Sequence, residues 1–241
     1  VEVLIAQTWN KELAYDVGDA LATEYADCGI YGWYGPAMNI HRSAFGGRNF
    51  EYYSEDSVLS GHIASSEVNA AAERGVYAYI KHFALNEQEG NRCSMLLTYS
   101  NEQTIREIYL KPFEISVKNF DFENNKPLAV MSSFVFIGDR WSGANPNLLN
   151  TVLREEWGFR GMVLTDWNGS YGYQNTDDCV RNGNDGMLGF MQHESNKLTD
   201  TDSATLAKAL RQASKNIMYT VANSGNYTVK DTNAGGLDNM T

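Results

Sequence analysis

The sequence predicts an α/β fold built on a parallel sheet, and two observations lead to this class. Short apolar runs typical of buried strands alternate along the chain with longer segments whose apolar residues recur at helical spacing. Three of the strand-like runs also end in polar pairs: Lys81-His82, Ser132-Ser133 and Asp166-Trp167. Such strand ends are typical of the active-site edge of a closed β/α barrel, and equally of an open doubly wound sheet.

The individual elements follow from these periodicities. Six apolar runs are expected to be strands, at 3–6, 31–40, 76–83, 128–134, 161–167 and 187–190. Helical spacing predicts helices at 9–28, 57–74, 102–119 and 146–157, with a shorter helix before residue 187. The last helix is expected from one apolar face, which is formed by Leu206, Leu210, Ala213, Ile217 and Val221.

The composition argues against several function classes. The 241 residues carry a formal net charge of −11, and no cluster of Lys and Arg interrupts it, which argues against nucleic acid or an anionic membrane as a partner. No apolar run approaches the ~20 residues of a membrane span. No Gly-rich phosphate loop follows a strand and the three cysteines lack zinc-ligand spacing, so we expect neither cofactor nor metal. The compartment stays open between bacterial cytoplasm and secretion.

Asp166 and Trp167 are the first candidate site residues, because they end a buried strand side by side. The carboxylate could act as a nucleophile, and the indole could form an apolar wall against a sugar ring. The competing interpretation is structural, since aspartate is also favoured where a strand turns into a helix. The fourteen tyrosines and five tryptophans suit sugar stacking, but they suit a large core equally well.

A second cluster follows the strand predicted at 76–83. Lys81 and His82 would place two hydrogen-bond donors at the strand end, where substrate hydroxyls could be held. Asn86, Glu89 and Arg92 follow in the next loop. The alternative is a pair of surface residues with a structural histidine. No second His or Cys lies at metal-ligand spacing from His82, so no metal is expected there.

The third cluster is the segment NIHRSAFGGRNFEYYSED at 39–56. Arg42 and Arg48 flank the pair Gly46-Gly47, and three acidic residues follow. Glycines permit close approach of the backbone, and an arginine can clamp vicinal hydroxyls or orient a carboxylate. A surface loop of ion pairs would have the same composition, but so long a polar loop needs a reason to stay ordered.

These clusters resemble the signature blocks of glycoside hydrolase family 3, the family of many β-glucosidases. NIHRSAFGGRNFEYYSEDSVLSG resembles the family's signature loop, and KHFALNEQEGNR, REIYLKPFE and LREEWGFRGMVLTDW resemble three further blocks in the same order. The resemblance extends from Val3 to Ser224. It implies a (β/α)8-type barrel that cleaves terminal β-linked sugars with retention of configuration.

The resemblance also implies roles for single residues. Asp166 matches the family's nucleophile, which forms a covalent glycosyl-enzyme. A retaining mechanism needs a second carboxyl group about 5 Å away as acid and base. The residues that match the sugar-binding positions are Arg48, Lys81, His82, Trp167 and, with weaker support, Arg42.

Three departures from the family pattern are expected to matter. The chain has no early DGP segment, so we expect an incomplete barrel that lacks its first βα unit. The family's acid/base glutamate usually lies on a separate sandwich domain, and Glu51, Glu87 and Glu89 do not match its position. Phe134 stands where the family usually has a tyrosine that contacts the nucleophile. The loss of that hydroxyl is expected to raise the pKa of Asp166.

We therefore expect a piece of a longer polypeptide, with a partial barrel at 1–224 and an irregular C-terminal tail at 225–241. A companion segment or chain would carry the acid/base residue. The leading function is a retaining β-glucosidase acting on a β-glucoside or oligosaccharide. The alternatives are a β-xylosidase or other exo-β-glycosidase on the same barrel, and a non-catalytic carbohydrate-binding fragment. An N-acetylhexosaminidase is disfavoured, because that branch resembles KHFPGHG where this chain has KHFALNEQEG.

Overall fold

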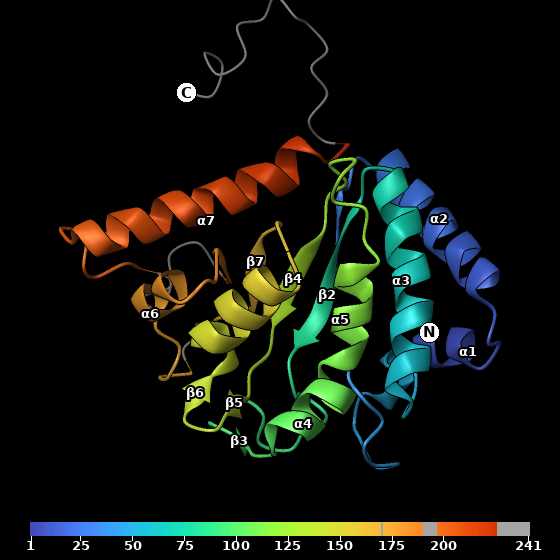
Figure 1. Cartoon of the computed structure of the whole chain (residues 1–241), viewed down its shortest axis with the longest axis horizontal. Helices are drawn as coiled ribbons and strands as arrows, with labels where there is room; N and C mark the ends of the chain where they lie inside the picture. The colour runs from blue at the N-terminus through green and yellow to red at the C-terminus, as the bar shows by residue number, and fades with distance from the viewer. Residues whose placement is uncertain (170, 190–196, 226–241) are drawn as a thin grey trace, which may run out of the picture.

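The structure is a computed structural model that describes residues 1–169, 171–189 and 197–225 (Figure 1). Within these ranges a five-stranded sheet has the order β1-β2-β4-β7-β8. Its strands are β1 (Gly32–Trp33), β2 (Tyr77–Phe83), β4 (Ala129–Ser132), β7 (Val163–Trp167) and β8 (Gly186–Leu188). Every pairing in it is parallel, so the carboxyl ends of the strands lie at one edge. The sheet is curled like half of a barrel, which confirms the predicted α/β class.

Helices pack against this sheet, with α2, α3 and α5 side by side (Figure 1). The α-helices are α1 (Glu2–Ala6), α2 (Lys11–Asp27), α3 (Ser57–Glu73), α4 (Glu102–Thr104), α5 (Lys111–Lys118), α6 (Thr176–Arg181) and α7 (Ala204–Ala222). Two segments of the described part are π-helical, η2 (Ile105–Tyr109) and η4 (Asn147–Glu156). The carboxylate of Asp56 caps α3 by accepting hydrogen bonds from two backbone N–H groups of its first turn, and the Asn10 side chain caps α2 in the same way.

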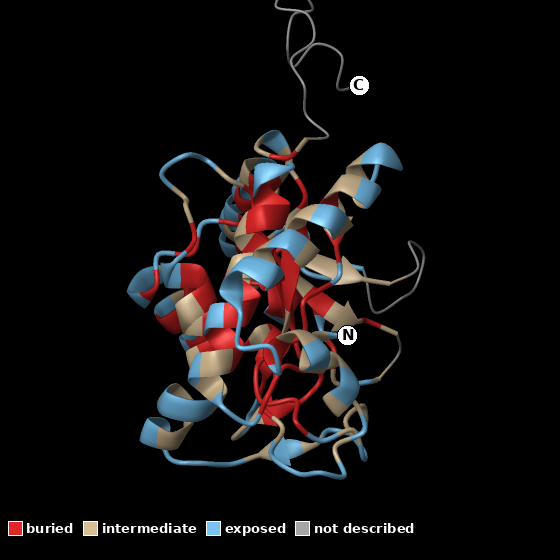
Figure 2. Ribbon diagram, turned by 90° about the vertical axis from the view of Figure 1, so that its right-hand side faces the viewer, coloured by how far each residue is buried: buried red, intermediate tan, exposed pale blue. Residues whose placement is uncertain are grey.

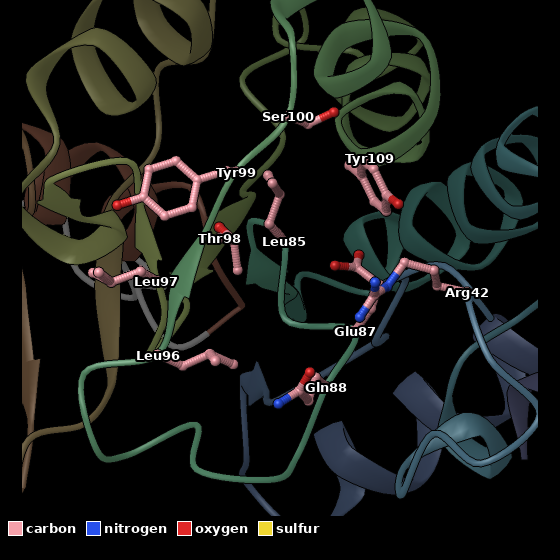
Figure 3. A pocket seen from close by; sticks show the side chains of 10 residues that line it. All are labelled: Arg42, Leu85, Glu87, Gln88, Leu96, Leu97, Thr98, Tyr99, Ser100 and Tyr109. Carbon is pink, nitrogen blue, oxygen red and sulfur yellow. The ribbon is translucent and has the colours of Figure 1, made fainter.

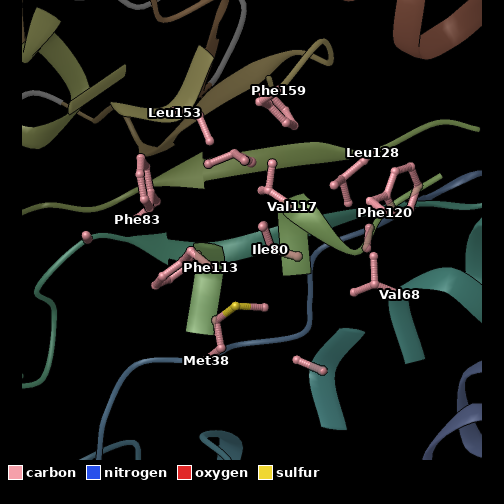
Figure 4. Packing of buried hydrophobic residues seen from close by; sticks show 14 of the residues in the cluster. Met38, Val68, Ile80, Phe83, Phe113, Val117, Phe120, Leu128, Leu153 and Phe159 are labelled. Atoms are coloured by element: carbon pink, nitrogen blue, oxygen red, sulfur yellow. The ribbon is translucent and has the colours of Figure 1, made fainter. Parts of the chain in front are cut away.

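The main core lies between the sheet and the helices (Figure 4). Ile80 and Phe83 of β2 are fully buried there, and the Phe83 ring lies 5.1 Å from the ring of Phe113 in α5, measured between centroids. Figure 2 shows the buried residues in the centre of the molecule and the exposed ones on the outer sides of the helices. On the opposite face of the sheet, Tyr79 packs with Met131 in a smaller cluster. Because both faces carry apolar side chains, the strands read as continuous apolar runs.

The prediction of a strand at 3–6 is wrong, because Glu2–Ala6 form the helix α1. The backbone N–H of Gln7 donates to the carbonyl of Val3 at 3.2 Å, as in a helix. An apolar run this short fits either a strand or one helical turn. The helix places Ala6 in the core and leaves Leu4 at the surface.

Three other expected elements differ in extent. The helix expected at 102–119 is divided into α4, η2 and α5, and α5 begins with Pro112 in its first turn, where proline lacks the N–H that a continuous helix would use. The strand expected at 31–40 is reduced to β1 and one isolated bridge, between Ala37 and Lys81. The run at 187–190 overlaps β8, and residue 190 lies outside the described residues, as does the predicted tail from 226 onward.

A second small sheet was not predicted. It has the order β3-β5-β6, with β3 (Leu97–Thr98), β5 (Phe136–Ile137) and β6 (Arg140–Trp141). Figure 1 shows it beside the carboxyl ends of β2 and β4. No helix of the described part is long and apolar enough to cross a membrane.

Candidate active site

The polar pairs that end β2 and β7 meet at the carboxyl edge of the sheet. Strand β4 lies between the two strands, yet Nε2 of His82 lies 3.7 Å from Oδ2 of Asp166. The register of β2 is irregular between Ile80 and Phe83, and the Lys81–His82 peptide bond is cis. Parallel strands thus bring together two residues that are 84 positions apart in the sequence.

Asp166 has a half-buried carboxyl group whose two oxygens differ in their surroundings. Oδ1 accepts a hydrogen bond from the backbone N–H of Trp167 at 2.7 Å. Oδ2 is buried and has no hydrogen-bond partner among the described residues. Burial raises the pKa of Asp166, whereas that backbone hydrogen bond and the positive charges of Arg92, Arg48 and Lys81 oppose the rise. The result is a carboxylate with one free oxygen in a basic environment.

His82 is fully buried beside this carboxylate. Its backbone N–H donates to Oδ1 of Asn39 at 2.8 Å, and its ring Nδ1 lies 3.3 Å from the same oxygen. Burial lowers the pKa of His82 well below its usual value, and the nearby cations Arg48 and Lys81 lower it further. The imidazole is therefore neutral at physiological pH. Asn39 was not predicted as a site residue, and no spacing in its loop signals the contact.

Arg48 and Lys81 reach the site from different segments and share one acidic partner. Arg48 follows the pair Gly46-Gly47 and forms an ion pair with Glu51, which lies 3.4 Å from Nζ of Lys81. A Cβ atom on Gly47 would lie 3.1 Å from Cγ of Glu89, so the predicted close approach of the backbone is present. Glu51 thus holds both basic groups together, close enough to Asp166 for their charges to lower its pKa.

Arg92 belongs with these residues, although it is not one of the predicted sugar-binding positions. Its Nε lies 3.0 Å from Oε2 of Glu89, and its guanidinium lies 4.8 Å from the ring centroid of Phe134. Among the charges that act on Asp166, that of Arg92 has the largest influence. The sequence feature that could have indicated Arg92 is its position in the loop after β2, close to Asn86 and Glu89. In the structure Nδ2 of Asn86 donates a hydrogen bond to Oε1 of Glu89 at 3.0 Å.

Arg42 lies elsewhere. It lines a cavity of about 220 Å³ together with Glu87 and Tyr109, beside the strand β3 (Figure 3). Its charge acts on Glu87, whereas the largest charge influences on Asp166 come from Arg92, Arg48 and Lys81. The structure therefore does not place Arg42 with the other predicted sugar-binding residues.

Trp167 is half-buried at the end of β7, where it pairs with Leu188 of β8. The following turn lies against the indole, since a Cβ atom on Gly169 would come within 2.0 Å of its Nε1. Only glycine fits this position without displacing the ring. The turn thus fixes the indole of the residue that follows Asp166, and its role as a wall against a sugar ring stays a prediction.

The glutamates near the site differ as proton donors. Burial raises the pKa of Glu51, but the hydrogen bond from Arg48 and the charge of Lys81 outweigh it and lower the pKa. Glu51 is therefore ionised and unsuited to donating a proton at neutral pH. Burial raises the pKa of Glu87 to about 7, but this side chain lines the cavity beside Arg42 and not the site around Asp166.

Comparisons with known proteins identify the family. The model of the glycosyl hydrolase family 3 N terminal domain matches residues 2–222. Beta-glucosidase A of Butyrivibrio fibrisolvens is 41% identical over 186 residues, which cover 77% of this chain and 21% of that protein. A beta-glucosidase of Rhizobium radiobacter is 43% identical over 171 residues, or 71% of this chain and 20% of the relative.

Solved structures agree with this result. The structure of beta-glucosidase 3B from Thermotoga neapolitana in complex with glucose matches with a TM-score of 0.81 and 37% identity, covering 94% of this chain and 32% of that chain. The chain therefore belongs to glycosyl hydrolase family 3, and the predicted barrel-type fold is confirmed. It spans about a fifth of the length of these curated relatives.

Proposed function

We propose that this chain is the barrel portion, residues 1–224, of a retaining β-glucosidase that uses Asp166 as its nucleophile. The observation that carries the proposal is the carboxylate at the end of β7. It has one buried oxygen without a hydrogen-bond partner among the described residues and lies within the influence of three basic side chains. The relatives named as β-glucosidases support the choice of reaction.

The first chemical step forms a covalent glycosyl-enzyme. An oxygen of Asp166 attacks the anomeric carbon, and the new ester bond forms as the bond to the leaving oxygen breaks. The leaving oxygen takes a proton from an acid group. Water then attacks the same carbon, gives up a proton to that group and releases Asp166. Arg48, Lys81 and His82 would hold the sugar hydroxyls, and Trp167 would cover the apolar side of the ring.

The acid group is proposed to come from a segment or chain outside these 241 residues. Glu51 is ionised and forms an ion pair with Arg48, so it is not suited to protonating a leaving group. The relatives are about five times longer than the matched region, which leaves room for such a segment. Non-catalytic sugar binding is the second candidate, because Glu51 does not suit the acid role.

The proposal is tested by labelling with 2,4-dinitrophenyl 2-deoxy-2-fluoro-β-glucoside. Its leaving group departs as a stable anion and needs no proton, so the step depends on the nucleophile alone. Intact mass and peptide mapping would follow the label. Asp166→Asn is the test variant, and Asp139→Asn, an exposed carboxyl on the β5–β6 turn, is the matched control.

The expected result is one label on the peptide that contains Asp166, in the wild type and Asp139→Asn but not in Asp166→Asn. Labelling of Asp166→Asn at the wild-type rate would contradict the proposal. Glucose binding without any label would favour the non-catalytic function. Faster labelling by the corresponding xyloside would indicate a β-xylosidase.

A further inference from the structure

A buried line of contacts connects the cavity in Figure 3 to the candidate nucleophile. It begins at Glu87, which lines the cavity and whose Oε1 accepts hydrogen bonds from Nδ2 of Asn39 and from the backbone N–H of Ile40, both at 3.4 Å. Asn39 contacts His82, and His82 faces Asp166. Asn39, Glu87 and His82 are all buried. A change at Glu87 can therefore reach Asp166 through direct contacts.

The amide of Asn39 has only one orientation that satisfies all of its partners. Its Nδ2 donates to the carbonyl of His82 at 3.0 Å and to Glu87, and both of these are acceptors. Its Oδ1 accepts from the backbone N–H of His82, which can only donate. A flipped amide would place the NH2 group against an N–H and the oxygen against two acceptors.

This orientation determines which nitrogen of His82 carries the proton. Nδ1 lies 3.3 Å from Oδ1 of Asn39, an acceptor, so Nδ1 is the protonated nitrogen. In a neutral imidazole the other nitrogen then has a lone pair. Nε2 faces Oδ2 of Asp166 at 3.7 Å, a separation without a hydrogen bond, as expected for two acceptors.

We propose that Glu87 is a positioning residue, which holds the amide of Asn39 so that His82 keeps its proton on Nδ1 and presents an acceptor at Nε2 beside Asp166. The part of this inference that concerns the substrate rests on the proposed function: Nε2 would accept a hydrogen bond from a sugar hydroxyl. The part that concerns the tautomer rests on the hydrogen bonds of Asn39 alone.

The charged and titratable groups around Glu87 come from three elements. Arg42 lies in the loop after β1, Tyr109 belongs to η2, and the charge of Glu87 also acts on Tyr52. Burial raises the pKa of Glu87 to about 7, opposed by the hydrogen bonds from Ile40 and Asn39 and by the charge of Arg42. An ionised carboxylate accepts hydrogen bonds about twice as strongly as a neutral acid. The hold on Asn39 is therefore firmest above pH 7 and weakens as Glu87 takes up a proton.

Nitrogen-15 NMR of histidine-labelled full chain tests the tautomer without any need for activity. The His82 signals would be assigned by their loss in His82→Asn. In the wild type, Nδ1 is expected to be protonated and Nε2 not. Glu87→Leu removes the acceptor and is expected to give a mixture of tautomers. Glu87→Gln keeps an acceptor oxygen and is expected to retain the wild-type tautomer, and Gln88→Ala, at the same cavity, is the matched control.

A pH titration keeps the proposal testable if Glu87→Leu does not fold. The wild-type Nε2 signal is expected to move with a midpoint near the pKa of Glu87, about 7. Glu87→Gln should show no such midpoint. A proton on Nε2 in the wild type, or the same titration in Glu87→Gln, would overturn the proposal.

The rate of covalent labelling links the tautomer to the reaction. Glu87→Leu is expected to label roughly ten-fold more slowly, which corresponds to the loss of one hydrogen bond at the reacting site, while Glu87→Gln stays within about two-fold at pH 8. If the wild type shows the expected tautomer but takes no label, the proposed function is contradicted and the positioning role of Glu87 is still supported. An unchanged labelling rate in a folded Glu87→Leu variant would show that the positioning of His82 by Glu87 does not affect the reaction.

Discussion

Asp166 and Asp185 lie at opposite ends of two neighbouring strands and have opposite surroundings. Asp185 precedes β8 at the amino edge of the sheet, where its Oδ2 accepts hydrogen bonds from Nη2 of Arg154 and from the backbone N–H of Val163, both at 2.7 Å. Its Oδ1 accepts one from Nδ2 of Asn216 at 2.8 Å. Asp166 ends β7 at the carboxyl edge and has a single hydrogen bond, from the residue that follows it, among the described residues.

Burial alone does not distinguish the two aspartates. The side chain of Asp185 is 2% exposed and that of Asp166 is 14% exposed. The difference lies in their partners, because every oxygen of Asp185 is used within the fold, whereas one oxygen of Asp166 has positive charge around it but no donor bonded to it. A buried carboxylate left partly unpaired costs stability, and such a cost is typical of a functional site.

Replacement of each aspartate by asparagine should separate stability from chemistry, and this is the largest expected effect. Asp185→Asn leaves the half-buried Arg154 without its counterion and should lower the free energy of unfolding by about 3 kcal/mol. Asp166→Asn should abolish the covalent label and change stability by less than about 1 kcal/mol, or raise it. Urea unfolding and intact mass would measure the two effects. Equal stability losses in both variants would contradict the comparison.

Glu67 in α3 extends the comparison to a buried acid that forms no ion pair among the described residues. It is 2% exposed, and burial raises its pKa to about 8. Between pH 4.5 and 8 the folded protein holds a proton that the unfolded chain has released, so this group makes stability fall as the pH rises, by about 1.4 kcal/mol per pH unit.

Glu67→Gln should remove that contribution and flatten the dependence of stability on pH. Unfolding free energies of the variant and the wild type at pH 6, 7 and 8 would measure it, since the other titrating groups cancel in the difference. Parallel curves for the two proteins would mean that Glu67 is not held neutral by burial.

Removal of the cation that most influences Asp166 should move the pH dependence of labelling. Arg92→Met takes a positive charge from the neighbourhood of the carboxyl, so the pKa of Asp166 rises further above its usual value. Because the nucleophile must be ionised, the acid limb of the rate profile should shift to higher pH. Arg211→Met, on the exposed side of α7, is the control and should leave the profile unchanged. If the pH–rate profile of labelling is not shifted in Arg92→Met, the charge of Arg92 does not act on Asp166.

The smallest effect is expected for an exposed ion pair. Arg106 contacts Glu156 at 2.7 Å and Glu102 at 2.8 Å, in the same chemistry as Arg154 and Asp185 but at the surface. Arg106→Ala should lower the free energy of unfolding by only about 0.5 kcal/mol, because water screens the pair. Urea unfolding at low and high salt would measure it. A loss as large as that of Asp185→Asn would show that burial does not control the strength of these pairs.

Much of the fold was predictable because it depends on local periodicity. The apolar runs of β2, β4 and β7 and the helical spacing of α2, α3 and α7 are visible in the sequence, and so are the polar residues that end the strands. The run at 3–6 failed, since a few apolar residues fit a helical turn as well as a strand. The division of the helix at 102–119 and the small sheet β3-β5-β6 depend on packing that no local pattern records.

The sequence by itself determined the family, the class of fold and the positions of Asp166, Lys81 and His82, because each lies in a recognisable block or at the end of a periodic run. Only the tertiary structure decided which arginine serves which acid, placing Arg42 at Glu87 and Arg92 near Asp166. It also decided the contacts of Asn39. The physical reason is that a strand's periodicity is a property of neighbouring residues, whereas a charge or an amide acquires its partners only when distant loops fold against the same edge of the sheet.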